Sequence, residues 1–90
     1  MSEASREVLI SNQRGLHARA SAKFVNLAAE LAAPIEVEKD GNRVSGTSIM
    51  GLMMLGAAKG DHITIHVTGD HADDALGKLV ALVEERFGEE

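Results

Sequence analysis

The 90-residue sequence contains no cysteine, no tryptophan and no tyrosine, and it has a single proline. Without cysteine the chain can form neither disulfide bonds nor thiolate metal sites, which suits a reducing compartment. No apolar run approaches the roughly 20 residues that a membrane-spanning helix requires. The first seven residues, MSEASRE, are polar and partly acidic, unlike an export signal. We therefore expect a cytoplasmic protein that does not insert into a membrane.

Positive charge and aromatic side chains are scarce as well. Nine lysines and arginines are outnumbered by 14 aspartates and glutamates, for a net charge of -5, and Phe, Tyr and Trp make up only 2% of the chain. A nucleic-acid surface usually needs a basic stripe or aromatic stacking platforms. We therefore exclude nucleic acid and expect protein partners. A composition with 44% hydrophobic and 26% charged residues is typical of one globular domain, here residues 1–90.

The spacing of apolar residues predicts seven elements in the order β-α-β-β-α-β-α. Asp40-Gly41 favours a hairpin because both residue types tolerate positive φ, and Asp70 is the expected cap of the last helix. The expected strands are residues 6–11, 35–39, 42–46 and 61–69, and the expected helices are residues 18–32, a short helix within 47–61, and residues 72–87. This order fits a two-layer α+β fold in which helices cover one face of the sheet and the other face meets water.

The segment NQRGLHARASAKFV, residues 12–25, gathers positive charge around one histidine, His17. If the first long helix begins just after Leu16, His17 stands at its N-cap, and the first-turn amides lack partners within the helix. Such amides favour a bound anion. The amides in question belong to Ala18, Arg19 and Ala20.

The chemistry of this segment suits a phosphoryl group. Arg14 and Arg19 add forked donors that match phosphate oxygens. Phosphorylated imidazole is a reactive phosphoramidate, so His17 could accept a phosphoryl group and pass it on. From these local features alone, the alternative is a histidine that serves only as a cap or a surface residue.

Three stretches of the chain together resemble the HPr family, the histidine-containing phosphocarrier proteins of the bacterial phosphoenolpyruvate-dependent phosphotransferase system. They are GLHARASAKFV, SIMGLMMLGAAKGDHITI and the C-terminal amphipathic helix, and the similarity runs from about residue 6 to residue 87. The resemblance implies an open-faced β-sandwich, in which a four-stranded antiparallel sheet of order 1-4-2-3 is covered on one face by three helices.

The resemblance also implies partners and a role for each site residue. Enzyme I would phosphorylate His17 on its Nδ1 nitrogen, Arg19 would stabilise the phosphoryl group, and a histidine of an enzyme IIA protein would receive it. We therefore expect a monomeric carrier and not an enzyme, with no cofactor and no metal. His62 and His66 lie about 13 Å apart along one expected strand, too far to share a metal ion.

One departure from the family concerns Ala20, because many HPr proteins carry proline at this position. The form HARA looks like alphaproteobacterial HPr and like the nitrogen-regulatory branch called NPr. Alanine keeps an N–H donor in the first helical turn but lacks the fixed φ of proline. The acceptor could therefore belong to sugar uptake or to nitrogen regulation.

The resemblance places a second modification site at Ser48, which matches the serine that HPr kinase/phosphorylase modifies in the family. Phosphate there would add a charge of about -2 at the start of the short helix and would disturb an apolar docking surface beside it. From the residues alone, Ser48 or Thr47 could instead be an ordinary helix cap.

The segment IMGLMML is apolar on every face of its helix, which favours a docking surface for several partners. Leu52 and Leu55 are expected to face the sheet. The expected docking residues are Lys23, Phe24, Ile49, Met50 and Met53. The alternative for any one of these methionines is that it fills a gap in the core.

We therefore predict a phosphocarrier, with a non-transferring regulatory module as the rival from another class. In that rival, phosphorylation would only change which proteins the domain binds. An autonomous enzyme is disfavoured because the sequence has no nucleotide-binding loop, paired carboxylates or nucleophile elbow. The acidic C-terminal residues Glu84, Glu85, Glu89 and Glu90 are interpreted as a solvated end.

Overall fold

The computed structural model describes residues 3–89, which form four strands, three α-helices and a final 3₁₀ turn. The strands are β1 (Glu3–Leu9), β2 (Ile35–Lys39), β3 (Asn42–Ser45) and β4 (His62–Thr68). The helices are α1 (Ala18–Leu31), α2 (Ile49–Met54) and α3 (Ala72–Glu84), followed by the 3₁₀ turn η1 (Arg86–Gly88). The strands and α-helices follow the expected order β-α-β-β-α-β-α.

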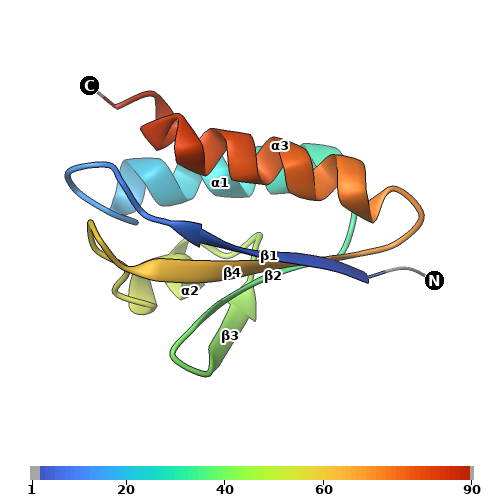
Figure 1. Ribbon diagram of the computed structural model, residues 1–90, viewed down its shortest axis with the longest axis horizontal. Coiled ribbons are helices and arrows are strands. Elements are labelled where there is room, and N and C mark those ends of the chain that lie inside the picture. Colours follow the sequence, from blue (N-terminus) through green and yellow to red (C-terminus); the bar gives the residue numbers. More distant parts are fainter. Residues whose placement is uncertain (1–2, 90) are drawn as a thin grey trace.

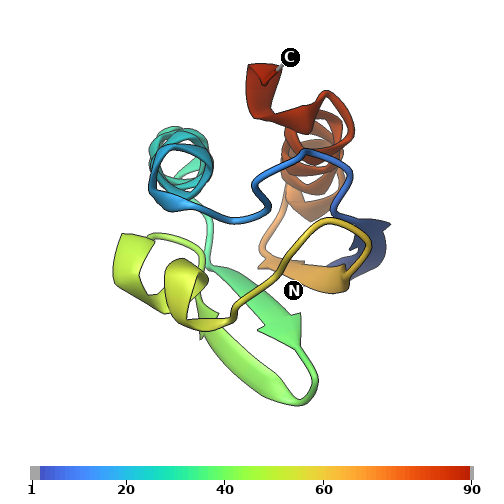
Figure 2. The same cartoon turned by 90° about the vertical axis from the view of Figure 1, so that its left-hand side faces the viewer.

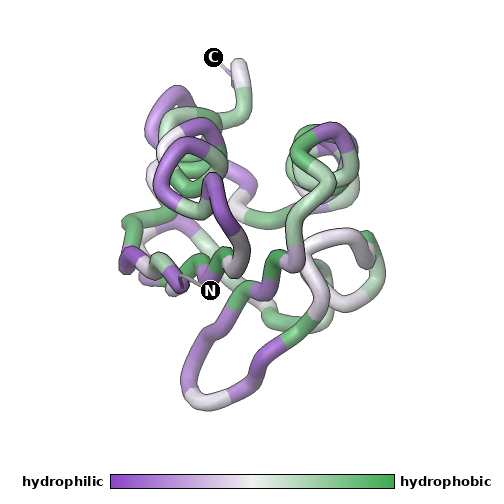
Figure 3. The backbone as a smooth tube through the Cα atoms, turned by 90° about the vertical axis from the view of Figure 1, so that its right-hand side faces the viewer, coloured by the Kyte–Doolittle hydropathy of each residue, from purple (hydrophilic) through white to green (hydrophobic). Residues whose placement is uncertain are grey.

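The strands make one antiparallel sheet in the order β1-β4-β2-β3, which confirms the expected topology. β1 and β4 pair along their whole length, from Glu3 opposite Thr68 to Leu9 opposite His62. The three α-helices of the described chain lie on one side of this sheet (Figure 2). The hydrophilic β2–β3 hairpin extends away from α1 and α3 (Figure 3). The fold is therefore the expected two-layer arrangement with one open sheet face.

The core lies between the sheet and the helices because alternate strand residues point to opposite faces. In β4, Ile63, Ile65 and Val67 are buried, and they meet Phe24 of α1 and Leu79 of α3 in one hydrophobic cluster. Burying a side chain of this size contributes about 1.5–3 kcal/mol. The period-two pattern read from the sequence thus sets which face of the sheet carries the helices.

The hairpin between β2 and β3 turns at the expected dipeptide. Asp40 and Gly41 have φ values of 52° and 85°. A pair of positive φ values is typical of the turn that matches the twist of two antiparallel strands.

The first strand differs from the expectation at both ends, because β1 starts at Glu3 and stops before Ile10. Its length is set by pairing with all seven residues of β4. Ile10 is buried outside the strand, where its N–H donates to Asp61 O (2.8 Å) and its carbonyl accepts from Gly60 N (2.8 Å).

The last helix begins at Ala72 as expected but differs in its N-cap and in its C-terminal end. Its N-cap is His71 and not Asp70, and the His71 carbonyl accepts the first helical bond, from Ala75 N at 3.1 Å. The helix ends at Glu84, after which Phe87 adopts a φ of 55° and turns into the core. The apolar stripe correctly marks Phe87 as buried, but a tight left-handed turn brings it there.

Residues 10–17, here called the histidine loop, join β1 to α1 and are fixed at several points. Leu16 N donates to Ala57 O (2.9 Å), and the buried Asn12 side chain donates from Nδ2 to Gly15 O (2.9 Å). Gly15 has a φ of 61°. A Cβ at this position would collide with the Ala57 carbonyl and lie 2.8 Å from Ala58 Cα. The loop therefore depends on glycine both for its backbone angle and for its contact with residues 57–58.

The structure predicts that Gly15→Ala lowers the free energy of unfolding by about 2–4 kcal/mol, because it combines backbone strain with a backbone collision. Gly41→Ala carries only strain, since no atom lies within 4 Å of its Cβ, and should cost about 1 kcal/mol. Gly77→Ala lies inside α3 in open space and should stabilise by about 0.5–1 kcal/mol. Urea unfolding of the three variants measures this order, and a Gly15→Ala value equal to that of Gly41→Ala would contradict it.

Candidate functional site

His17 occupies the N-cap of α1, as the sequence predicts. Its backbone is extended (φ -74°, ψ -179°), and its carbonyl accepts a bond from Ser21 N at 2.9 Å. This bond is the first of the helical ladder, so the three preceding amides have no acceptor inside the helix. These amides are those of Ala18, Arg19 and Ala20, which are the expected phosphate-binding residues. The helix thus begins with unpaired donors beside an imidazole.

The imidazole of His17 does not cap the helix with its side chain. Instead Nδ1 lies 3.0 Å from the carbonyl oxygen of Gly15. A carbonyl can only accept, so Nδ1 carries a proton in this conformation and the neutral ring has its lone pair on Nε2. The family resemblance implies phosphorylation on Nδ1, and the contact with Gly15 has to break before that nitrogen can react.

Glu84 and Glu85 are exposed as expected, and Glu90 lies outside the described residues. Glu89 instead reaches over the site, so the expectation of a solvated end is wrong for this residue. The Glu89 carboxylate accepts bonds from Asn12 Nδ2 and from Arg14 N, both at 3.3 Å, and lies 3.8 Å from His17 Nε2. Its side chain is only 20% exposed, as is that of His17. Figure 1 shows the chain after α3, drawn in red, at the same end of the molecule as the loop before α1. The structure therefore places an acidic group against the histidine.

Glu89 is ionised more readily than an ordinary glutamate. Partial burial opposes ionisation, but hydrogen bonds from Asn12 and the Arg14 amide, together with the charge of His17, outweigh it and lower the pKa of Glu89 below 4.5. A carboxylate with a lowered pKa stabilises the fold above the unfolded value and loses this contribution as pH falls through the folded value. Glu89 is accordingly a carboxylate at neutral pH.

Lys23 and Phe24 follow on α1, and the structure gives them different places. Lys23 Nζ donates to Phe87 O at 2.7 Å and so ties the C-terminal turn to α1. Phe24 is 1% exposed in the core. The prediction that Phe24 contacts a partner is therefore wrong, because the helical stripe that made it conspicuous is the stripe that packs on the sheet.

A hollow of about 120 Å³ brings the site residues together. It is bounded on one side by residues of the histidine loop and α1, and on the other by the last residues of the chain. Its lining comprises Arg14, His17, Arg19, Ala20, Lys23, Phe87, Gly88 and Glu89. The two exposed arginines, the histidine and the helix start form one positively charged cradle, with Glu89 as its acidic member.

Ser48 is the N-cap of α2, and its Oγ accepts a bond from Gly51 N at 2.9 Å. This bond satisfies one of the amides at the helix start. The residue is partly exposed. The capping alternative is therefore confirmed.

α2 lies beside α1 (Figure 2), and several of its apolar side chains are exposed. Leu52 and Leu55 are buried as expected, whereas Met50 is 71% exposed. Sequence reasoning missed Met54, which is 80% exposed. We call Ile49, Met50, Met53 and Met54 the methionine patch.

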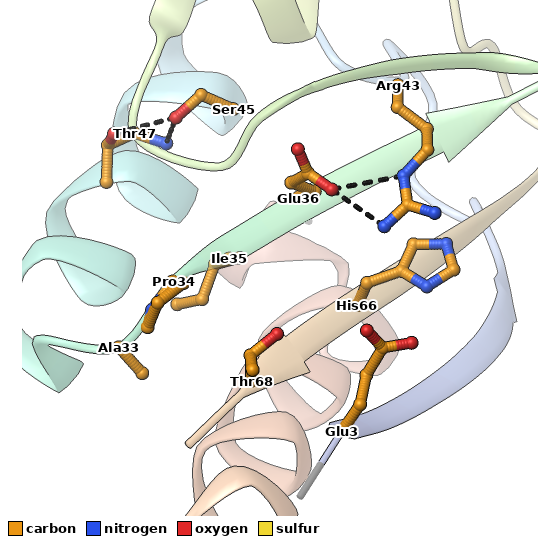
Figure 4. Close-up of a pocket in the computed structure, with 10 residues that line it drawn as sticks. All are labelled: Glu3, Ala33, Pro34, Ile35, Glu36, Arg43, Ser45, Thr47, His66 and Thr68. Atoms are coloured by element: carbon orange, nitrogen blue, oxygen red, sulfur yellow. Dashed lines mark hydrogen bonds and ion pairs between the residues drawn. The ribbon is translucent and has the colours of Figure 1, made fainter. Parts of the chain in front are cut away.

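A larger hollow, of about 460 Å³, lies on the open face of the sheet (Figure 4). Its lining includes the hydrogen-bonded pair Glu36 and Arg43, and also His66, whose Nε2 is 2.8 Å from Glu38 Oε1. None of the expected site residues lines it. Among residues 3–89, the structure has no helix that is long and apolar enough to span a membrane.

Sequence reasoning missed Asn12 and Glu89 as members of the site. Asn12 could have been noticed, because an asparagine three residues before a glycine is typical of a turn held by its own side chain. Glu89 gave no local signal, because its contacts join residues 75 and 77 positions apart in the chain.

Comparison with known proteins agrees with this geometry. Residues 4–85 match the family model for the PTS HPr component phosphorylation site. The phosphocarrier protein HPr of Cupriavidus necator is 42% identical over 84 residues, covering 93% of this chain and 94% of the relative. The phosphocarrier protein NPr of Shewanella violacea is 40% identical over 89 residues, covering 99% and 98%.

A solved structure shares the whole fold. The crystal structure of HPr-C-His from Thermoanaerobacter tengcongensis superposes with a TM-score of 0.88 at 42% identity, covering 100% of this chain and 99% of that one. An open-faced sheet, with a histidine at the start of a helix whose first amides have no acceptor within that helix, is the arrangement of the histidine-containing phosphocarriers. Within that class, this chain belongs to the HPr family of the phosphotransferase system.

Proposed function

We propose that His17 accepts a phosphoryl group from enzyme I and delivers it to a histidine of an enzyme IIA protein. The observation that carries this proposal is the position of His17 at the N-cap of α1, beside amides that have no acceptor within the helix. Such amides stabilise an anion through their own dipoles. The protein then acts as a covalent intermediate in the cytoplasm and works as a monomer.

The transfer chemistry follows from the neutral imidazole. The lone pair of one ring nitrogen attacks phosphorus as the bond between phosphorus and the donor's nitrogen breaks. We propose Nδ1 as the phosphorylated nitrogen. The ring first gives up its contact with Gly15 O, and its proton passes through solvent from Nδ1 to Nε2, which frees the Nδ1 lone pair. The new phosphoramidate bond is labile, and the group leaves again when the acceptor's histidine attacks.

Arg19 is proposed to hold the phosphoryl oxygens while charge shifts between donor and acceptor. Arg19 is among the residues that line the hollow containing His17. A forked donor is suited to this role because two N–H groups can bind two oxygens at once. Ala20, where many HPr proteins have proline, contributes an additional N–H to the same cradle.

The pathway is proposed to be sugar uptake or nitrogen regulation. The similarity to both an HPr and an NPr is compatible with either branch.

Regulation at Ser48 by HPr kinase/phosphorylase is a further proposal. Its hydroxyl lies at the start of α2 next to the methionine patch, so a phosphate there would place charge on an apolar surface.

The methionine patch, together with Lys23, is proposed as the docking surface for enzyme I and enzyme IIA. Exposed methionines fit partners of different shape because the thioether chain is flexible and polarisable. The patch lies on α2, which packs on the helix that carries the cradle. A partner bound there would lie beside the helix that begins at His17.

We expect a mass gain of one phosphate when the protein is mixed with enzyme I and phosphoenolpyruvate. The modification should be labile in acid and stable in base, and His17→Ala should abolish it. Arg19→Ala should remain folded but slow transfer about 10- to 100-fold, the value of a charged hydrogen bond. Rapid-quench mass spectrometry measures both. A gain that persists in His17→Ala would leave only the rival, a regulatory module modified elsewhere.

Docking is tested with a double variant, Met50→Ala with Met53→Ala, which should weaken binding to enzyme I about tenfold because it removes apolar contacts. Ser48→Asp should also weaken binding but keep the stability of α2, since aspartate is a good N-cap. Leu9 follows the buried Val8 in β1, so its side chain points away from the core and is exposed. Leu9→Ala therefore removes an exposed apolar side chain outside the methionine patch and is the matched control. Calorimetry with unphosphorylated enzyme I gives the affinities. Equal affinities for the double variant and the control would contradict the proposal that the methionine patch is a docking surface.

A further inference from the structure

The amide of Ala20 is the buried one among the first-turn amides of α1. Ala20 is 0% exposed and lines the hollow that contains His17. Two carbonyls lie within helical reach of its N–H, those of Leu16 and His17. Within residues 3–89 neither accepts from it: His17 O accepts from Ser21 N at 2.9 Å, and Leu16 O accepts from the Ser21 hydroxyl at 3.2 Å. Buried amides without an acceptor are rare because they are costly, so this one requires an explanation.

The side chain of the N-cap residue is the first competitor for such an amide, and α1 does without it. In α2 the corresponding third amide, Gly51 N, donates to the hydroxyl of the N-cap Ser48 at 2.9 Å. In α1 the N-cap is His17, whose Nδ1 faces the Gly15 carbonyl at 3.0 Å and makes no cap bond. The cap of α2 therefore satisfies the third amide of its helix, whereas the cap of α1 leaves it free.

The Leu16 carbonyl is the second competitor, because an α-helix bonds each N–H to the carbonyl four residues earlier. If Leu16 O accepted from Ala20 N, α1 would begin one residue earlier and His17 would become its first helical residue. The Ser21 side chain, in a residue that is 0% exposed, donates its hydroxyl to Leu16 O instead. Leu16 N is held from the other side by Ala57 O at 2.9 Å. Both backbone groups of Leu16 are thus held away from Ala20.

We propose that Ser21 is a positioning residue of the carrier site: its hydroxyl occupies the Leu16 carbonyl and so keeps the Ala20 N–H free for a phosphoryl oxygen. This inference rests on the proposed carrier function of His17 and names the residue that preserves one of its donors. In the described part of the chain Ser21 does not line the hollow, so it acts through Ala20. The role exists only because residue 20 is alanine, since proline has no N–H to preserve.

Loss of the Ser21 hydroxyl would leave Leu16 O without a donor, in a residue that is only 5% exposed. A rotation of the peptide between Leu16 and His17 would then bring this carbonyl to the Ala20 N–H and satisfy both groups at once. Ser21→Ala should therefore extend α1 by one residue and withdraw the Ala20 N–H from the hollow. Alanine is smaller than serine and a better helix former, so we expect this variant to fold.

The direct test is the scalar coupling across a hydrogen bond between Ala20 N and the Leu16 carbonyl carbon, measured by NMR in the unmodified protein. We expect no coupling in the wild type and a measurable coupling in Ser21→Ala. Ser45→Ala is the matched control and should resemble the wild type, because the Ser45 hydroxyl is also hydrogen-bonded, to Thr47 Oγ1 at 2.9 Å, but lies outside the cradle. A coupling in the wild type, or none in Ser21→Ala, overturns the proposal.

A double-mutant cycle with Ala20→Pro separates positioning from a merely structural effect. With alanine at position 20, Ser21→Ala should slow phosphorylation of His17 by enzyme I about tenfold, the lower end of the range for a hydrogen bond to a charged group. With proline at position 20, the same change should alter the rate by less than about twofold, because no N–H remains to be preserved.

The outcomes of the cycle separate the role of Ser21 from the carrier function. Equal slowing in both backgrounds would show that the hydroxyl does not act through the Ala20 N–H, and it would overturn the proposal. If the wild type is not phosphorylated on His17, the carrier function itself fails. The coupling between Ala20 N and the Leu16 carbonyl carbon then decides by itself whether Ser21 keeps the two groups apart.

Discussion

The first turn of α1 offers hydrogen-bond donors that the helix itself cannot use, and the site is built around them. The amides of residues 18–20 are unpaired within the helix because the first carbonyl of the ladder belongs to His17. The histidine loop fixes this start, through Gly15 against residues 57–58 and Leu16 against Ala57. Without that anchoring the helix could begin a turn later and the imidazole would lose its neighbours. The sheet and the other helices hold these two segments in place.

The fold was largely predictable from the sequence because its signals are local and repeated. Alternation in residues 62–68 and the three–four spacing in α1 each report burial of one face, and Asp40-Gly41 reports a turn. The errors lie at ends that distant contacts decide. Pairing with β4 extends β1 to Glu3, and the buried Phe87 ends the last helix early, in a left-handed turn. A periodic pattern records which residues are buried, but it does not record whether a helix or a turn brings them inward.

Only the part of the site that binds an anion was predictable from the sequence. His17, Arg19 and the first-turn amides are neighbours in the chain, so their chemistry could be read as one motif. Phe24 shows the limit of this reading: it shares the motif but faces the core. Glu89 shows the opposite limit, since a terminal acid that looks solvated is folded back over the histidine. An acidic protein can thus hold a concentrated positive cradle and still screen it with its own C-terminal carboxylate.

The central claim is that the opening amides of α1 bind the phosphoryl group carried by His17. Backbone amide proton shifts, compared between the unmodified protein and the protein phosphorylated by enzyme I, test it most directly. The account predicts large downfield shifts for Ala18, Arg19 and Ala20, with small changes elsewhere in α1. Unshifted first-turn amides in a protein whose His17 is fully phosphorylated would contradict it.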